Sequence, residues 1–332
     1  MLRVGLFGFG RIGRVHAANV VAHRQATLAS VYETDPAGRD RAVDLYGVRA
    51  CESVDELLGD DSIDAVIIAS PTPTHVELLT ASVRAGKATL CEKPIDLDIS
   101  KVDACRAAIA EYEVPVMIGF HRRFDPSLAA IDRAVRAGEI GDVECLRITA
   151  RDPAPAPVEY IAVSGGQVRD MTIHDFDLVR WLVDSEPSEL IAMGANLFEQ
   201  GYAELGDTDT VHLLIRTEAG AIATIENSRR GTYGYDQRLE IFGSEGALLM
   251  DNQYEVSLER HGAAGTKRRG TVLPGFIERY SDAYVQEIDH FVTSIVDGRT
   301  PKVSFEDGRK ALLMADAALE SMERNAIVAV PG

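Results

Sequence analysis

The sequence predicts an α/β protein of two domains, with a parallel-sheet domain over residues 1–120 and an α+β domain over residues 121–332. The first 120 residues alternate short apolar runs with helical patterns, which is typical of βαβ units and a parallel sheet. A glycine motif follows the first apolar run at residues 8–13. Beyond residue 120, closely spaced strand-like segments joined by glycine-containing turns favour a large, mostly antiparallel open sheet.

The elements of the first domain follow from hydrophobic periodicity. Near-continuous Val, Ile and Leu predict strands that are buried on both faces. These strands are expected at residues 3–7, 26–32, 65–69, 88–91 and 115–119. Helical patterns fill the intervals at residues 11–22, 36–47, 74–85 and 99–111.

The second domain is expected to combine helices with one open sheet. Helices are predicted at residues 126–137, 171–183, 280–297 and 305–323. Strands are predicted at residues 143–150, 189–198, 210–216, 221–228, 237–242 and 255–258. A broad sheet of this kind has a face that needs covering.

Composition excludes several classes of protein. The chain has 34 Lys and Arg against 52 Asp and Glu, a formal charge of -18, which argues against binding to nucleic acid or to anionic membranes. No stretch predicts a membrane helix and no signal-peptide pattern opens the chain, so we expect a cytoplasmic protein. Four scattered cysteines form no CxxC pair, and we expect neither a metal site nor a disulfide framework.

The glycine motif predicts a dinucleotide site. Gly8-Phe9-Gly10-Arg11-Ile12-Gly13 has the pattern GxGxxG between a predicted strand and a predicted helix. In a Rossmann domain the first glycine makes the tight turn, the second admits the pyrophosphate and the third lets helix and strand pack closely. The N–H groups at the start of the helix then bind phosphate.

An acidic residue after the second strand indicates which nicotinamide cofactor is bound. Glu33 follows Gly13 by 20 residues, where a carboxylate is expected to accept hydrogen bonds from the adenosine ribose. No Lys or Arg directly follows it to compensate a 2′-phosphate, which favours NAD over NADP. Asp35 is the alternative ribose ligand, and Glu33 is preferred because it lies at the strand end.

Two further loops follow predicted strands at the edge where cofactors bind. Ser70, Thr72 and His75 lie after the third predicted strand, within cofactor reach, although the prolines there could simply end the strand. Glu92 and Lys93 lie after the next one and are expected to face the cofactor. Taken alone, Lys93 is better explained as a surface lysine.

Asp170 and His174 have the i, i+4 spacing that puts both on one face of a helix. An aspartate can orient a histidine base, although, from spacing alone, a helix cap and a locally bonded histidine explain the pair better. Oxidation of a secondary alcohol needs a hydride acceptor, a base and a positive donor. NAD, His174 and Lys93 could fill these roles without a metal.

Taken together, these residues resemble the glucose–fructose oxidoreductase / inositol dehydrogenase family, and the resemblance spans nearly the whole chain. Its motifs are the glycines at residues 8–13, EKP at 92–94, GFHRRFD at 119–125, RDP at 151–153, DMTIH at 170–174 and YGYD at 233–236. EKP is a family motif, whereas GFHRRFD and YGYD are more specific to the inositol-oxidising branch.

The resemblance implies a catalytic trio of Lys93, Asp170 and His174. His174 would take the hydroxyl proton, Lys93 would polarise the reacting oxygen, and Asp170 would orient these groups or relay the proton. The resemblance also implies substrate contacts, with His174 joined by Arg122, Asp152, Tyr233 and Tyr235. A domain-junction salt bridge for Arg122 and sheet packing for the tyrosines remain alternative explanations.

The implied activity is NAD-dependent oxidation of a cyclic polyol, with myo-inositol converted to its 2-keto derivative, by a homotetramer of inositol catabolism. His121 and Asp152 depart from some relatives, which leaves the stereoisomer open. Alternatives are a dehydrogenase for scyllo-inositol, D-chiro-inositol or an aldose, and a non-catalytic NAD-binding sensor. Loss of Lys93 or His174 would favour the sensor, but the chain retains both.

Overall fold

The computed structural model describes residues 1–263 and 265–332. It forms two compact units, of which unit 1 comprises Met1–Phe124 and Ala283–Leu312, and unit 2 comprises Asp125–Asp282 and Leu313–Gly332. These units differ from the two predicted ranges because residues 283–312, expected in the second domain, belong to unit 1. Residues 283–312 lie far from residues 1–124 in the sequence. A division of the chain into two consecutive ranges therefore cannot place both segments in one unit.

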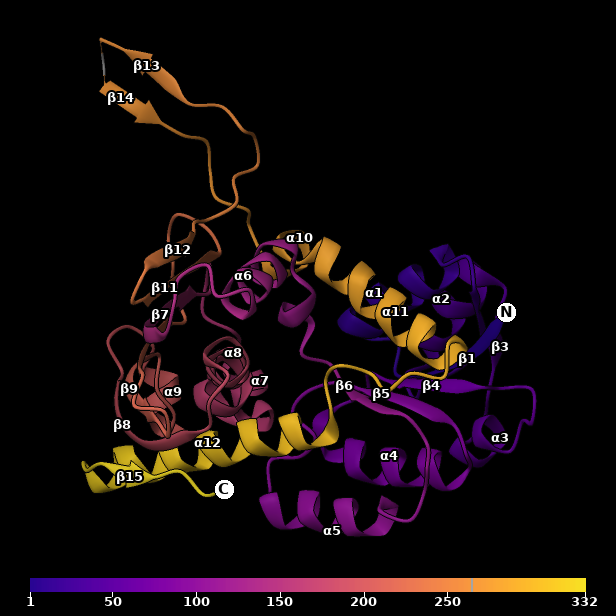
Figure 1. Ribbon diagram of the computed structural model, residues 1–332. Coiled ribbons are helices and arrows are strands. Elements are labelled where there is room, and N and C mark those ends of the chain that lie inside the picture. Colours follow the sequence, from indigo (N-terminus) through magenta and orange to yellow (C-terminus); the bar gives the residue numbers. More distant parts are fainter. Residues whose placement is uncertain (264) are drawn as a thin grey trace. The chain divides into compact units, whose positions relative to one another are not determined.

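Unit 1 is built on a six-stranded parallel sheet with the order β3-β2-β1-β4-β5-β6 (Figure 1). Its strands are β1 (Leu2–Phe7), β2 (Ala26–Tyr32), β3 (Arg49–Ala50), β4 (Ala65–Ile68), β5 (Ala88–Cys91) and β6 (Val116–Ile118). Every residue of β4 and β5 is buried, as expected for central strands covered on both faces. The strand order reverses between β1 and β4, and a ligand crevice in such a sheet lies at the carboxyl ends there.

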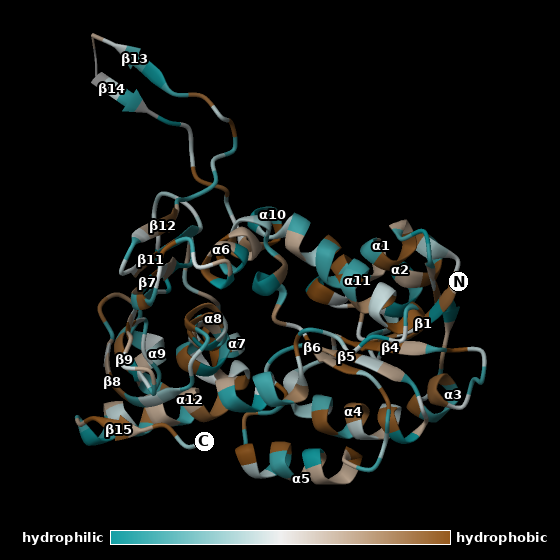
Figure 2. Cartoon of the chain, viewed as in Figure 1, coloured by the Kyte–Doolittle hydropathy of each residue, from teal (hydrophilic) through white to brown (hydrophobic). Residues whose placement is uncertain are grey.

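Helices cover both faces of this sheet. They are α1 (Arg11–Ala22), α2 (Pro36–Tyr46), α3 (Val54–Leu58), α4 (His75–Arg84), α5 (Ile99–Ile109) and α11 (Ser281–Val296). Figure 1 shows α1, α2 and α11 on one face and α4 and α5 on the other. Apolar colouring follows the strands in Figure 2, in agreement with a core on both sides of the sheet.

Unit 2 contains a seven-stranded sheet with the order β12-β11-β7-β10-β9-β8-β15. The strands are β7 (Val143–Arg151), β8 (Pro187–Ala195), β9 (Thr210–Thr217), β10 (Ile222–Ser228), β11 (Asp236–Gly243), β12 (Gly246–Met250) and β15 (Val328–Ala329). The expected antiparallel pairing holds for most neighbours, but β7 and β10 pair in parallel. Their carboxyl ends therefore meet, with Arg151 opposite Ser228.

Helical elements complete unit 2. They are α6 (Pro126–Arg136), α7 (Val158–Ser164), the π-helical turn η3 (Val168–Thr172), α8 (Ile173–Val183), α9 (Gln200–Glu204), α10 (Phe276–Arg279) and the later part of α12 (Phe305–Arg324). The strand predicted at residues 255–258 is wrong. Instead, β13 (Arg260–Gly262) and β14 (Gly265–Arg268) form a separate two-stranded sheet. None of the helices in the described residues has the length and apolarity that a membrane crossing requires.

A buried ion pair anchors the first helix of unit 2. Asp125 caps α6 by accepting hydrogen bonds from the N–H groups of Ser127 and Leu128 at 3.0 and 3.1 Å. Its second oxygen accepts from Arg279 Nη1 at 2.5 Å, and the two side chains are 2% and 1% exposed. One carboxylate thus joins α6 to α10 while satisfying the helix terminus.

Because this pair is buried, replacement of Asp125 by Ala leaves the Arg279 charge without compensation. We expect Asp125→Ala to lower the free energy of unfolding by about 3–5 kcal/mol, measured by urea titration. Asp132→Ala on the same helix, which removes an exposed pair with Arg136, should cost at most about 1 kcal/mol. Equal losses in the two variants would contradict the anchoring role of Asp125.

Candidate active site

The glycine loop after β1 has the geometry of a dinucleotide-binding turn. Gly8 has a φ of +88°, a conformation that L side chains rarely adopt. A Cβ on Gly13 would lie 2.1 Å from the carbonyl oxygen of Gly8, so only glycine permits this helix–strand contact. A Cβ on Gly10 would meet nothing within 4 Å, and no side chain caps α1. The backbone at this helix N-terminus therefore suits a pyrophosphate.

The other residues of the loop serve the turn in different ways. The Phe9 side chain is buried and its ring packs edge-on against Tyr46, with 6.2 Å between the centroids. Arg11 is exposed and Ile12 is half-buried in the first turn of α1. Because the Phe9 side chain packs in the core, only the backbone of Phe9 is placed to contact a cofactor.

Glu33 and Asp35 have distinct local roles at the end of β2. Glu33 accepts hydrogen bonds from the N–H of Phe9 at 2.5 Å and from that of Asp35 at 2.8 Å, so its carboxylate lies against the glycine loop. Asp35 caps α2 through the N–H groups of Ala37 and Gly38. This arrangement favours Glu33 as the ribose ligand because its carboxylate lies against the glycine loop, whereas that of Asp35 caps α2.

The loop after β4 touches the glycine loop. A Cβ on Gly8 would lie 2.7 Å from the backbone nitrogen of Ser70, and Ser70 Oγ lies 2.6 Å from Thr74 Oγ1. Thr72 opens the short helical turn η1 (Thr72–Thr74). The two ring nitrogens of buried His75 lie 2.8 Å from the carbonyl oxygens of Ser70 and Pro94, respectively. His75 thereby connects this loop with the one after β5, a structural role that the sequence did not reveal.

Lys93 lies directly after β5, between buried Glu92 and a cis peptide bond to Pro94. Glu92 Oε1 lies 2.7 Å from Nε2 of His16, a fully buried histidine on α1. The carboxylate of Glu92 is therefore turned toward α1 and away from bulk solvent. Lys93 itself is half-buried at the carboxyl edge of the sheet, where it was expected.

Arg122 lies beyond β6 at the same edge of the sheet. It is buried, within the short helical turn η2 (His121–Phe124). His121, which precedes it, stacks on Tyr284 of α11 with 4.4 Å between the ring centroids. The carboxyl ends of β1, β2, β4, β5 and β6 thus all carry predicted site residues.

In unit 2, Asp170 and His174 occupy a π-helical turn and the α-helix that follows it. Asp170 lies in η3, and His174 lies buried in the first turn of α8. The hydroxyl of Tyr160 donates to Asp170 Oδ1 at 3.1 Å. The helix cap considered for Asp170 is absent, because Thr172 is the N-cap of α8. Single π turns in helices occur often at functional sites.

Arg229 belongs to the candidate site, although no motif in the sequence indicated it. It is 3% exposed, and its guanidinium donates to Asp152 Oδ2 at 3.2 Å and to Asp170 Oδ2 at 3.3 Å. Burial alone lowers its pKa, but the charges of Asp170 and Asp152 outweigh burial and raise it. One buried cation therefore brings a predicted substrate ligand and a predicted catalytic residue together.

The parallel pairing of β7 and β10 explains how these groups meet. Asp152 follows the end of β7 and Arg229 follows the end of β10, so the two lie at one edge of the sheet. Asn227 holds the helix beside them, since it donates to Asp175 at 2.7 Å and accepts from Thr172 at 2.6 Å. The antiparallel sheet expected from sequence offered no reason to join these strand ends.

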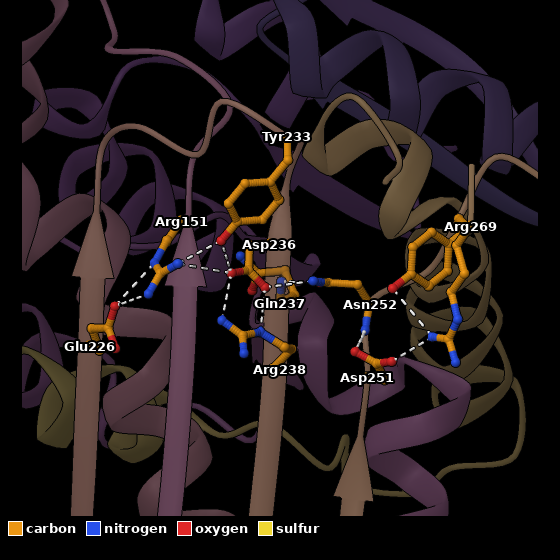
Figure 3. A network of polar contacts seen from close by, with 10 residues as sticks. Arg151, Glu226, Tyr233, Asp236, Gln237, Arg238, Asp251, Asn252 and Arg269 are labelled. Carbon is orange, nitrogen blue, oxygen red and sulfur yellow. Dashed lines mark hydrogen bonds and ion pairs between the residues drawn. The ribbon is translucent and has the colours of Figure 1, made fainter. Parts of the chain in front are cut away.

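The two predicted tyrosine ligands have different surroundings. Tyr233 is 45% exposed, and its hydroxyl donates to Asp236 at 2.5 Å and accepts from Arg151 at 2.6 Å (Figure 3). Burial and the hydrogen bond to Asp236 raise the pKa of Tyr233. Tyr235 is buried and packs edge-on against Tyr280, with 6.1 Å between the centroids. Tyr235 therefore also fits the alternative explanation of aromatic packing on the sheet.

The predicted site residues are divided between the units. Unit 1 carries Gly8, Phe9, Gly10, Arg11, Ile12, Gly13, Glu33, Ser70, Thr72, His75, Glu92, Lys93 and Arg122. Unit 2 carries Asp152, Asp170, His174, Tyr233 and Tyr235. Within the described residues, one group of potential metal ligands occurs, formed by His16, Glu92 and Glu287. Within unit 1, the arrangement around the glycine loop fits a dinucleotide.

Comparisons with known proteins agree with this geometry. Residues 2–120 match the model of an oxidoreductase family with an NAD-binding Rossmann fold, and residues 128–249 match the GFO/IDH/MocA C-terminal domain. Inositol 2-dehydrogenase of Rhizobium meliloti is 44% identical over 323 residues, which cover 97% of each chain.

Solved structures show the same relationship. The myo-inositol dehydrogenase of Corynebacterium glutamicum is 46% identical and covers 100% of this chain and 99% of its own, with a TM-score of 0.96. The scyllo-inositol dehydrogenase of Lactobacillus casei, crystallised with NAD(H) and scyllo-inositol, is 31% identical over 99% of both chains, with a TM-score of 0.93. The chain belongs to the GFO/IDH/MocA family of NAD-binding oxidoreductases.

Proposed function

We propose that the protein is an NAD-dependent inositol 2-dehydrogenase that oxidises myo-inositol to 2-keto-myo-inositol. The observation that carries this proposal is the full-length similarity to enzymes named for this activity, at 40–44% identity over 97% of the chain. The Lys93, Asp170 and His174 positions of the family pattern are all retained. In the reaction the secondary alcohol loses a hydride and a proton and becomes a ketone, while NAD⁺ becomes NADH.

The catalytic roles follow from the chemistry of the side chains. Bound NAD supplies the hydride acceptor. His174 takes the proton of the reacting hydroxyl, and Lys93 donates a hydrogen bond to the oxygen as negative charge develops on it. Asp170, which accepts from Tyr160 and from Arg229, is held in one orientation from which it orients the base or relays its proton.

The polar groups of the proposed substrate site suit a compound with many hydroxyls. Asp152 can accept hydrogen bonds from the hydroxyls, and Arg122 and Tyr235 can donate to their oxygens. The hydroxyl of Tyr233 already donates its proton to Asp236, so its oxygen can accept a hydrogen bond from the substrate. Fixed donors and acceptors reject analogues that leave them unpaired, which is how such a site discriminates stereoisomers. We infer that Arg229 is a positioning residue, because its guanidinium holds both Asp152 and Asp170.

Two further features of the proposal concern assembly and location. We propose a homotetramer in which the open face of the unit 2 sheet is covered by other copies. The exposed apolar side chains Met193, Leu214, Phe242 and Leu249 on its strands support this. The four free cysteines support a cytoplasmic location. The proposed oxidation of inositol supports a role in inositol catabolism.

The primary test is the formation of NADH by the purified protein with NAD and myo-inositol. NADP replaces NAD in one parallel reaction, and scyllo-inositol, D-chiro-inositol or glucose replaces myo-inositol in the others. We expect turnover with myo-inositol and NAD to exceed every other combination. Higher turnover with another polyol would mean that the same mechanism acts on that polyol and that myo-inositol is not the preferred substrate. Measurable NAD binding without any turnover would support the sensor alternative instead.

His174→Ala should lower kcat by about 100-fold or more, because it removes the general base. NAD affinity, measured by quenching of protein fluorescence, should change little. His261→Ala is the matched control because His261 is exposed on β13, and we expect it to retain wild-type turnover. Wild-type kcat in His174→Ala would refute the assignment of the base.

Arg229→Gln should lower kcat/KM by about tenfold or more, because Asp152 and Asp170 lose their shared buried countercharge. The free energy of unfolding should also fall by about 3–5 kcal/mol. The neighbouring Arg230 is exposed, so Arg230→Gln serves as the control and should leave both quantities nearly unchanged. If the two variants behave alike, Arg229 does not position the site.

A further inference from the structure

Three titratable side chains meet in the interior of unit 1. His16 lies on α1, Glu92 follows β5 and Glu287 lies on α11, and one ligand atom from each lies within 4.8 Å of the others. All three residues are buried. The cluster thus connects the helix of the glycine motif, the residue before Lys93 and a helix from a distant part of the sequence.

The contact between His16 and Glu92 is a direct hydrogen bond. Nε2 of His16 lies 2.7 Å from Oε1 of Glu92, and the histidine is fully buried. A cation bound to both atoms at metal-ligand distances near 2.1 Å would hold them about 3 Å or more apart. The observed separation of 2.7 Å is that of a hydrogen bond between the two side chains.

Glu287 has the opposite environment, because nothing in the described residues donates to it. It is 0% exposed, and neither carboxyl oxygen has a hydrogen-bond partner. Burial, and after it the charge of Glu92, raises the pKa of Glu287 well above its usual range. An ionised Glu287 would place a second negative charge beside Glu92 without any compensating donor.

A neutral Glu287 resolves this difficulty. A protonated carboxyl has one O–H donor, and the carboxylate of Glu92 is the acceptor that the cluster offers it. Three other titratable rings belong to this part of unit 1. The ring centroids of His16 and Tyr284 lie 5.9 Å apart, and His121 stacks on Tyr284. Glu92 would then be held from two sides, by His16 and by Glu287.

We propose that Glu287 is a neutral acid in the folded protein, that it donates its proton in a hydrogen bond to Glu92, and that it thereby positions Lys93. Glu287 is then a positioning residue for the dehydrogenase reaction, a role that rests on the proposed function. The hydrogen bond fixes the side chain of Glu92 and with it the backbone from which Lys93 extends. No proton leaves the cluster during turnover.

The first measurement is the pH dependence of thermal stability, which requires no substrate. A carboxyl that stays protonated in the folded state loses its proton first in the unfolded state, at a pKa of about 4.3. The contribution of Glu287 to wild-type stability should therefore decline as the pH rises above that value toward the folded pKa. Glu287→Gln cannot ionise, so its melting temperature should exceed that of the wild type by a margin that grows with pH.

The second measurement separates positioning from folding. Glu287→Gln retains a donor for Glu92 and should keep kcat within about threefold of the wild type. Glu287→Leu fills the space without a donor and should lower kcat by about tenfold or more while NAD affinity stays unchanged. Asp289→Asn makes the same carboxyl-to-amide change on the exposed face of α11 and should alter neither kcat nor the pH dependence.

Several outcomes would overturn the inference. If the stability of Glu287→Gln relative to the wild type does not increase with pH, the native carboxyl is ionised. Stoichiometric divalent metal in the purified protein, lost from Glu287→Gln, would show a metal ligand instead. Equal kcat in Glu287→Leu and wild type would remove the positioning role. An inactive wild type with the expected pH behaviour would instead refute the proposed function and leave the neutral acid intact.

Discussion

The close contact between Gly13 and the carbonyl oxygen of Gly8 is the constraint on which unit 1 depends. A single methyl group on Gly13 would lie 2.1 Å from that oxygen, so α1 packs at this depth only with glycine there. This depth leaves the start of α1 open for phosphate and brings Phe9 N–H to Glu33. One turn further along, it brings His16 to Glu92. Cofactor recognition and the support of Lys93 thus depend on the same helix position.

Buried charges hold the rest of the candidate site in place. Arg229 joins Asp152 to Asp170 in unit 2, where two carboxylates near each other would otherwise repel. In unit 1, Glu92 and Glu287 lie close together and would also repel each other if both were ionised. The proposed proton on Glu287 removes this repulsion, as Arg229 does in unit 2. Because breaking a buried pair is more costly than breaking an exposed one, such contacts specify one arrangement of the groups that they join.

The sequence predicted what depends on local patterns. The strand–helix alternation, the glycine loop and the position of Glu33 all follow from spacing along the chain, and the structure contains the corresponding elements. Long-range pairing was beyond such reasoning. The parallel contact of β7 with β10, which brings Arg229 to Asp152, leaves no periodicity in the sequence. The π turn at Asp170 adds only a small irregularity to an otherwise helical pattern. In the sequence, Glu287 is one polar residue of an amphipathic helix. Its proximity to Glu92, which is distant along the chain, appears only in the structure.

In the proposed reaction a hydride passes directly from an inositol carbon to NAD. The most direct test uses myo-inositol carrying deuterium at carbon 2, with nuclear magnetic resonance of the reduced cofactor as the measurement. We expect one deuterium at carbon 4 of the dihydronicotinamide ring and an equal amount of 2-keto-myo-inositol. Reduced cofactor without deuterium would mean that the hydride comes from another carbon or another donor, and the proposed reaction would be wrong.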